Sequence, residues 1–127
     1  FFERQSRAYS HNKALDCDHI YGDTFTLQSD AVEGIGNNVS LVFDEMDFGE
    51  QGTARILICG RAPVDNTIHI SFTGSTGTSR QIIEFGKSDT YVEREFELTP
   101  VSGKQSVSFI FLPGSNFDFA WFKFQGR

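Results

Sequence analysis

Hydrophobic and polar residues alternate along much of this chain with a period of two. Two segments show the alternation most clearly, with apolar side chains at Ile68, Ile70 and Phe72 in the first and at Val107, Phe109 and Phe111 in the second. Because successive side chains of a β-strand point to opposite faces, each set predicts one buried face of a strand. We therefore expect these residues in a hydrophobic core.

Turn residues divide the chain into nine short predicted strands. They cover residues 14–20, 24–27, 38–43, 53–60, 67–72, 80–85, 91–98, 105–112 and 119–125. No window of ten or more residues combines helical apolar spacing with a cap. Short strands joined by turns are typical of an all-β fold, here a two-sheet antiparallel β-sandwich or jelly roll.

Composition narrows the class of protein. The chain has 127 residues, 14 Phe and 12 Gly, which suits a single domain made of strands and tight turns. Its net charge of −6, without a Lys/Arg cluster, argues against nucleic acid or an anionic membrane as a partner. Residues 1–12 are polar and aperiodic, so we interpret them as a linker or domain-boundary remnant and residues 13–127 as the module, cut from a longer protein.

Two cysteines, Cys17 and Cys59, fall in predicted strands with apolar neighbours. A domain of this size does not need a disulfide to fold, so we expect two reduced, buried thiols. A Cys17–Cys59 disulfide is the alternative.

Four motifs, taken in order, resemble the family 6 carbohydrate-binding modules. They are residues 38–49 (NVSLVFDEMDFG), the turn 99–103, the strand 107–111, and the closing segment 116–124 (NFDFAWFKF). The resemblance spans roughly residues 14–125. The chain is also similar to C-terminal appendages of family 2 glycoside hydrolases that act on β-galactosides. The resemblance implies a β-jelly roll that binds glycan and holds an attached enzyme near its substrate.

The resemblance also implies a sugar site at the loop edge of the sandwich. Family members hold a terminal sugar between two aromatic rings, helped by an amide side chain, because a sugar ring has an apolar C–H face and a fringe of hydroxyls. Tyr91 matches one aromatic position. The second falls in a loop without an aromatic residue, where we expect Ile35 as an apolar wall and Asn37 beside it. The amide position matches Asp118, or Asn116 if the loop is shifted by two residues.

Each of these residues also has a structural interpretation. Tyr91 begins a strand with an acidic exposed face, so it also suits a surface aromatic residue. Asn116 lies in a Pro-Gly turn, where Asn commonly supports turn geometry. Trp121 is a possible sugar platform, but its Phe-rich surroundings favour core packing. His69 alternates with two isoleucines and is expected as a solvated or hydrogen-bonded strand residue.

Asp16 and Asp18 are two residues apart on a predicted strand, which points both carboxylates to the same face. Their mutual repulsion favours a cation, and calcium binds carboxylate and carbonyl oxygens. Family members often place a structural calcium ion against this strand, although their acidic residue before the Trp-Phe pair is Ala120 here. Asp23, Asp30 or Glu33 can compensate for that ligand. Turn-capping or solvated acids are the alternative.

No catalytic motif stands out. The chain has no nucleophile elbow, no His/Cys metal spacing, no phosphate loop and no pair of acids marked by its context for glycoside hydrolysis. We therefore expect a non-catalytic carbohydrate-binding module that targets an attached glycoside hydrolase to a neutral glycan such as a β-galactoside. The alternative is a structural domain that braces a catalytic domain without binding sugar. The expected location is outside a bacterial cell or on its surface, with an intracellular location left open.

Overall fold

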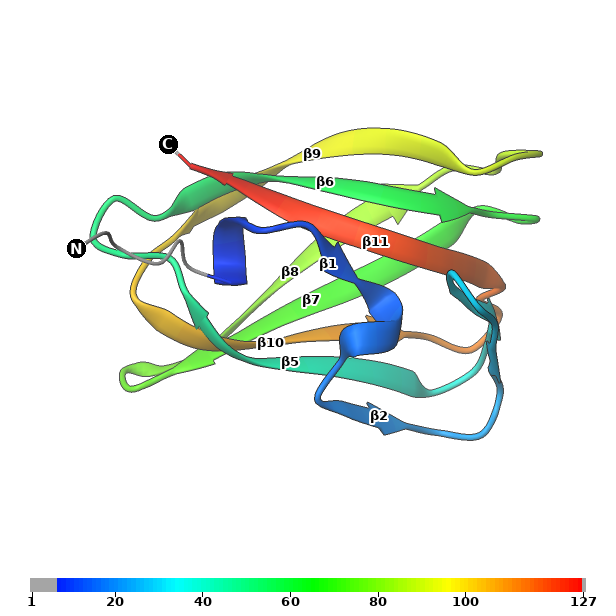
Figure 1. Ribbon diagram of the computed structural model, residues 1–127, viewed down its shortest axis with the longest axis horizontal. Helices are drawn as coiled ribbons and strands as arrows, with labels where there is room; N and C mark the ends of the chain where they lie inside the picture. The colour runs from blue at the N-terminus through cyan, green and yellow to red at the C-terminus, as the bar shows by residue number, and fades with distance from the viewer. Residues whose placement is uncertain (1–6, 127) are drawn as a thin grey trace.

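The computed structural model describes residues 7–126 and shows two antiparallel β-sheets packed face to face (Figure 1). In chain order the elements are η1 (Arg7–Tyr9), β1 (Asn12–Lys13), η2 (Ala14–Asp16), β2 (His19–Tyr21), β3 (Thr26–Leu27), β4 (Val32–Ile35), β5 (Val39–Asp47), β6 (Thr53–Arg61), β7 (Asn66–Gly74), β8 (Gly77–Phe85), β9 (Val92–Val101), β10 (Lys104–Phe111) and β11 (Phe117–Gly126). The predicted all-β sandwich is confirmed. No helix in residues 7–126 has the length and apolar character needed to cross a membrane.

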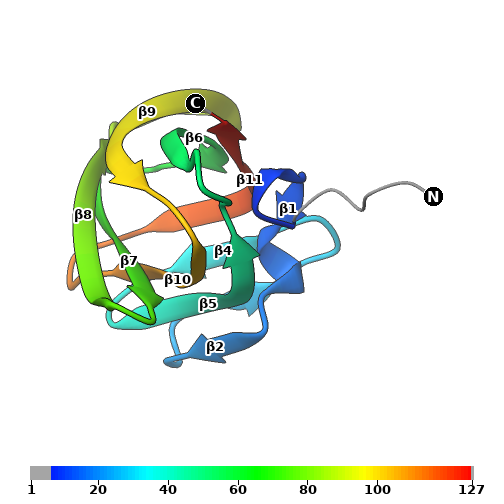
Figure 2. The same cartoon turned by 90° about the vertical axis from the view of Figure 1, so that its left-hand side faces the viewer.

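The strands form one sheet of six and one of five. Sheet A has the order β3-β4-β11-β6-β9, with β1 added along β11, and sheet B has the order β2-β5-β10-β7-β8. Figure 2 shows the two layers end-on, with β8 and β9 at the same side of the sandwich. Strands distant in sequence therefore become neighbours in sheet A, and this order decides which side chains meet on its outer face.

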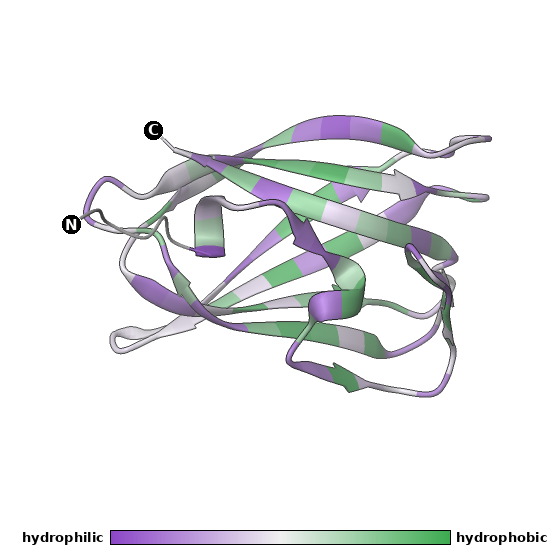
Figure 3. Ribbon diagram, viewed as in Figure 1, coloured by the Kyte–Doolittle hydropathy of each residue, from purple (hydrophilic) through white to green (hydrophobic). Residues whose placement is uncertain are grey.

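The core lies between the sheets and is built mainly from phenylalanine. Most of its rings meet edge to face or tilted, as aromatic quadrupoles prefer: Phe122 lies 4.7 Å from both Phe43 and Phe109, and Phe48 lies 4.8 Å from Phe124 between ring centroids. Figure 3 shows hydrophobic and hydrophilic colours alternating along the strands. The residues predicted for the core are buried as expected: Ile68, Ile70, Phe72, Val107, Phe109, Phe111, Phe122 and Phe124.

Trp121 does not belong to this core, so its interpretation as a core residue was wrong. Its neighbour Phe122 is fully buried, and alternation turns the Trp121 side chain to the outer face of sheet A, where it is half-buried. There its ring lies 4.3 Å from the ring of His11, tilted by 37°. A residue between two buried phenylalanines in sequence is not necessarily a core residue.

The N-terminal segment differs most from the prediction. Residues 14–16 form the 3-10 helix η2 instead of a strand, and only His19–Tyr21 pair with β5. Ala8 has no exposed surface, Tyr9 Oη donates to Phe48 O at 2.5 Å, and β1 pairs with β11. Residues 7–12 are therefore part of the sandwich, not a linker, while residues 1–6 lie outside the described residues.

Both cysteines are unpaired and half-buried. Burial, followed by the neighbouring acids, raises the pKa of each thiol. The two thiols do not pair with each other in the structure, and they are half-buried where the prediction had them buried.

Candidate functional site

Four polar side chains, from β4, β11, β6 and the residue that precedes β9, meet on the outer face of sheet A. Phe117 and Phe119 are buried, so Asp118 between them points outward, opposite Arg61 of β6 in the strand register. Glu33 of β4 and Tyr91, immediately before β9, flank this pair on either side. We call Glu33, Asp118, Arg61 and Tyr91 the polar band. It lies where β6 ends and where β9 and β11 begin, at the right-hand end of Figure 1.

Arg61 is the centre of the polar band. Its Nε donates to Asp118 Oδ2 at 2.7 Å, and its Nη2 lies 3.6 Å from Glu33 Oε2. Its Cζ lies 4.9 Å from the centroid of the Tyr91 ring, within range of a cation–π contact. The hydrogen bond and charge of Asp118 raise the pKa of Arg61 further above neutrality. One guanidinium therefore joins two carboxylates and an aromatic ring.

Tyr91 reaches across the sheet to Glu33. Its Oη donates to Glu33 Oε2 at 2.6 Å. Burial raises the pKa of Tyr91 strongly, and the hydrogen bond and charge of Glu33 raise it further, while Arg61 acts in the opposite direction. The hydroxyl therefore remains a donor at any ordinary pH, and the ring is held at both its polar end and one face.

Both oxygens of the Asp118 carboxylate have donors. Oδ2 accepts from Arg61, and Oδ1 accepts from the Gly34 N–H at 2.9 Å. Gly34 has φ +62°, a left-handed conformation that glycine adopts without strain, and this turns its N–H toward β11. Asp118 is 6% exposed, so it acts as a fixed anchor for Arg61.

A pocket of about 440 Å³ opens beside Tyr91. It is lined by Gln28, Ser29, Asp30, Ala31, Glu33, Tyr91 and Ala120. The Tyr91 ring supplies an aromatic wall, and the turn between β3 and β4 supplies amide, hydroxyl and carboxylate groups. Among the described residues that line the pocket, Tyr91 is the single aromatic one. Such a pocket suits a small polar molecule that also carries an apolar face.

The structure brings together only part of the site predicted from sequence. Tyr91 and Asp118 both belong to the polar band, joined through Arg61. Ile35 is fully buried in the core, because it pairs with Phe117 between β4 and β11, so its assignment as an exposed wall was wrong. Asn37 is exposed in the turn before β5.

Asn116 is exposed, and its main chain is bound to another residue. Its N–H donates to Asn66 Oδ1 and its carbonyl accepts from Asn66 Nδ2, both at 3.0 Å. This supports the turn interpretation of Asn116, whose bonds to Asn66 use its main chain. The sugar-site role of Asn116 and Asn37 stays a prediction.

Sequence reasoning missed Glu33, Arg61 and the turn at residues 28–31 as partners of Tyr91. The only local signal was Arg61 itself, a charged residue that follows the largely apolar run 56–60. Assigning it to the site requires the order of strands in sheet A, which the local pattern does not contain.

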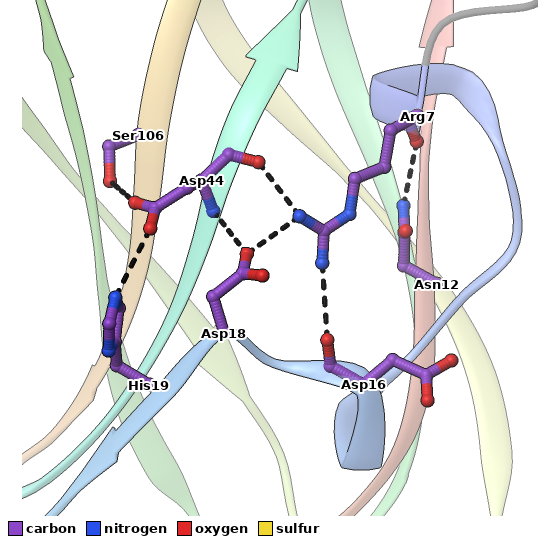
Figure 4. Close-up of polar contacts among 7 residues, drawn as sticks. All are labelled: Arg7, Asn12, Asp16, Asp18, His19, Asp44 and Ser106. Carbon is purple, nitrogen blue, oxygen red and sulfur yellow. Dashed lines mark hydrogen bonds and ion pairs between the residues drawn. The ribbon is translucent and has the colours of Figure 1, made fainter.

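The residues named for calcium are arranged differently from the prediction (Figure 4). Asp18 Oδ2 accepts from Arg7 Nη1 and from the Asp44 N–H, each at 2.7 Å, and the Asp16 carboxylate points away from Asp18. No group of three or more His, Cys, Asp or Glu side chains in residues 7–126 is arranged to hold a metal ion. The donor set does not fit calcium while Arg7 is bound to it, and the calcium site itself stays a prediction.

His69 lies on β7 and faces the outer side of sheet B, because its neighbours Ile68 and Ile70 are buried. It is half-buried, and its Nδ1 is buried without a hydrogen-bond partner among the described residues. It was predicted to be solvated or hydrogen-bonded, and its half-exposed ring agrees with solvation, while the Nδ1 atom alone is buried.

Comparison with known proteins identifies the fold. No protein-family model and no curated protein matches the chain. Among solved structures, it is similar to a family 6 carbohydrate-binding module from Clostridium stercorarium in complex with cellobiose, with 22% identity, 94% of this chain and 95% of that chain covered, and a TM-score of 0.82. A family 6 carbohydrate-binding module from Clostridium cellulolyticum in complex with xylose gives 23% identity, coverage of 93% and 98%, and a TM-score of 0.78.

A third similar structure is an exo-β-1,3-galactanase from Phanerochaete chrysosporium with galactose. It gives 14% identity and a TM-score of 0.67, and the match covers 91% of this chain but 29% of the enzyme. The chain therefore has the fold of the family 6 carbohydrate-binding modules. It covers nearly the whole length of the two modules and a minor part of the galactanase.

Proposed function

We propose that this chain is a non-catalytic carbohydrate-binding module that holds the end of a neutral glycan in the pocket beside Tyr91. The observation that carries the proposal is the Tyr91 ring, held rigidly at the wall of a pocket with polar groups opposite it. A sugar ring stacks its C–H face on an aromatic ring and gives its hydroxyls to amide and carboxylate oxygens. The pocket of a family 6-like sandwich offers both kinds of contact.

The polar band prepares Tyr91 for stacking before any ligand arrives. The hydroxyl is bound by Glu33 and one face of the ring is covered by Arg61, so the ring loses little freedom when a sugar binds. We assign the face opposite Arg61 as the sugar platform. A single ring and a few hydroxyl contacts support weak binding, with a dissociation constant of about 0.1–1 mM.

The charges at the site favour an uncharged sugar. Arg61 carries one positive charge, which Asp118 and Glu33 together more than match, and Asp30 adds a further carboxylate to the pocket lining. Like charges brought together at a surface repel across a few ångströms. We therefore infer that glycans bearing uronate or sulfate groups bind less well than neutral ones.

We favour a β-galactoside as the ligand. This follows from the sequence resemblance to appendages of β-galactoside hydrolases, and the similar galactanase bound to galactose is compatible with it. The similar modules bound to cellobiose and xylose make glucosides and xylosides the competing ligands. Attached to a glycoside hydrolase outside a bacterial cell, the module would keep the enzyme near such a glycan.

The proposal is tested by titrating the domain with lactose, cellobiose and xylobiose, using calorimetry and NMR chemical shifts. Tyr91→Ala should remove binding, because it deletes the platform, while Tyr91→Phe should keep most of it. Tyr21→Ala is the matched control: Tyr21 is a 58% exposed tyrosine on sheet B, away from the pocket. Circular dichroism of each variant checks that the fold persists.

Two results would overturn this assignment. If Tyr91→Ala binds as well as the wild type and Tyr21→Ala does not, the sugar site is on sheet B. If no neutral glycan binds the wild-type domain, the second candidate function holds, a structural domain that braces a catalytic domain. The presence of one aromatic residue in the pocket lining, where a second would complete a sandwich, is the observation that keeps this candidate open.

A further inference from the structure

Three oxygen atoms from separate parts of the chain converge on the guanidinium group of Arg7 (Figure 4). Nη1 donates to Asp18 Oδ2 at 2.7 Å and to Asp44 O at 2.8 Å, and Nη2 donates to Asp16 O at 3.2 Å. One carboxylate and two main-chain carbonyls are the oxygen types that calcium binds in proteins. We propose that Arg7 is the resident cation of this acidic corner, and that it excludes calcium from the oxygens of Asp16, Asp18 and Asp44.

The acidic corner needs a positive charge, and Arg7 is placed to supply it. Asp16, Asp18 and Asp44 lie around the Arg7 guanidinium, and of their three carboxylates only that of Asp18 is turned toward it. The Asp44 carboxylate has its own partners, since Oδ1 accepts from Ser106 Oγ at 2.9 Å and Oδ2 lies 3.3 Å from His19 Nε2. Asp18 depends on Arg7 and on the Asp44 N–H. The guanidinium therefore occupies the point where a metal ion would have to sit.

Arg7 also links separate segments of the chain, as a bound metal ion would. Its side chain joins η1 to the η2 segment and to β5, and its Cζ lies 5.5 Å from the centroid of the buried Phe43 ring. A planar guanidinium directs several donors at once, which a lysine ammonium group does not. Arg7 thus fixes the N-terminal segment to sheet B through oxygens of η2, of Asp18 in the connection to β2, and of β5.

Removing Arg7 should therefore convert the corner into a weak metal site. In Arg7→Ala the three oxygens lose their common donor, and the space of the side chain opens to water. Three protein oxygens with water completing the shell suit calcium, at a dissociation constant of about 1 mM, the weak end of calcium sites in extracellular modules. Asp18→Asn removes the one charged ligand of the three and should prevent binding.

The experiment compares thermal unfolding in chelator with unfolding in calcium at about ten times that dissociation constant, at matched ionic strength. The wild-type melting temperature should be the same in both. Arg7→Ala in chelator should melt about 3–6 °C lower than wild type, and calcium should restore part of the loss. Arg7→Ala with Asp18→Asn should melt low in both conditions.

Arg7→Gln serves as the second variant if Arg7→Ala does not fold, because it keeps a side chain of similar width without the charge, and it should also gain a response to calcium. A wild-type melting temperature that falls in chelator would overturn the proposal, since calcium would then be resident together with Arg7. So would single Arg7 variants that show no response to calcium by melting or by calorimetric titration with calcium chloride.

Discussion

The side-chain amide of Gln81 forms two hydrogen bonds with the main chain of Thr99, one donated and one accepted, as a neighbouring β-strand would. Gln81 Nε2 donates to Thr99 O at 2.8 Å, and the Thr99 N–H donates to Gln81 Oε1 at 2.7 Å. Gln81 lies on β8, the edge of sheet B, and Thr99 lies on β9, the edge of sheet A. One amide therefore links the two sheets at this side of the sandwich. It also occupies the main-chain N–H and C=O of Thr99 on edge strand β9, which would otherwise be open to pairing with another chain.

Replacing Gln81 with alanine should weaken this link without disturbing the core. Two hydrogen bonds are lost, but both lie in exposed positions where water replaces them, so we expect a loss of about 1 kcal/mol in the free energy of unfolding. Denaturant titration gives the free energy, and hydrogen exchange should show faster exchange of the Thr99 amide. Gln51→Ala, at an exposed turn, is the control. Unchanged exchange at Thr99 would contradict the prediction.

Asn66 makes the same pair of bonds with Asn116, but in a buried setting. Asn66 is 1% exposed, and its Nδ2 also donates to Val64 O at 2.8 Å. Asn66→Ala should therefore cost more than Gln81→Ala, about 2–3 kcal/mol, because it deletes a buried side chain that makes three hydrogen bonds. The two variants measured side by side in denaturant test burial as the cause. Equal losses would show that burial does not govern these amide pairs.

Neighbouring residues of β11 should differ sharply in their contribution to stability. Phe122 lies in the core against Phe43 and Phe109, so Phe122→Ala should cost about 3–5 kcal/mol. Trp121 is half-buried against His11 on the outer face, so Trp121→Ala should cost about 1–2 kcal/mol despite the larger side chain. Denaturant unfolding of both variants checks the order. If Trp121→Ala lost more free energy of unfolding than Phe122→Ala, the prediction would be wrong and Trp121 would contribute as a core residue does.

The period of two was sufficient to predict the interiors of the long strands, because side chains there alternate between core and solvent. It failed at three kinds of position. Residues 14–16 satisfy their backbone groups in a 3-10 turn, which an alternating polar pattern does not distinguish from a strand. Strand β4 contains Gly34 at positive φ and lacks the alternation. Trp121 follows an irregularity in the pairing of β11 with β6, so counting from its Phe neighbours was unreliable.

The polar band could not be predicted from the local sequence pattern, for a different reason. Tyr91 and Asp118 could be proposed because a family resemblance ranked them. Glu33 and Arg61 lie 28 positions apart in sequence and meet only because β11 lies between β4 and β6 in sheet A. The local sequence around Glu33 and Arg61 therefore contains no pattern that predicts their contact.

The pH dependence of stability should report the environment of Tyr91. A tyrosine in an unfolded chain ionises near pH 10, and burial together with Glu33 raises the pKa of Tyr91 in the fold. The protonated form therefore contributes stability that is fully present below pH about 10 and is lost as pH rises toward the folded value. Wild-type stability should fall more steeply than that of Tyr91→Phe between about pH 9 and 11. The raised pKa of Tyr9 affects both proteins alike, so equal slopes would contradict the prediction.

Arg61 should contribute more to stability than Arg55, although both lie on β6 and both pair with acids. Arg55 Nη1 lies 3.5 Å from Glu95 Oε1, and both of these side chains are largely exposed, so Arg55→Ala should cost about 0–1 kcal/mol. Arg61 bonds the nearly buried Asp118 at 2.7 Å and stacks on Tyr91. Removing it leaves a nearly buried carboxylate with only the Gly34 N–H as a donor, so we expect Arg61→Ala to cost more than Arg55→Ala.

Arg61→Lys separates charge from shape at the same position. A lysine keeps the positive charge but loses the planar stacking and the Nε donor, so its stability should fall between those of wild type and Arg61→Ala. Denaturant titration at low and at about 1 M salt checks the origin of the effect, because salt screens exposed pairs more than buried ones. The loss in Arg55→Ala should shrink at high salt while most of the loss in Arg61→Ala persists. If both losses shrink alike, Asp118 is not held as a buried partner, and the rigid anchoring of Tyr91 fails with it.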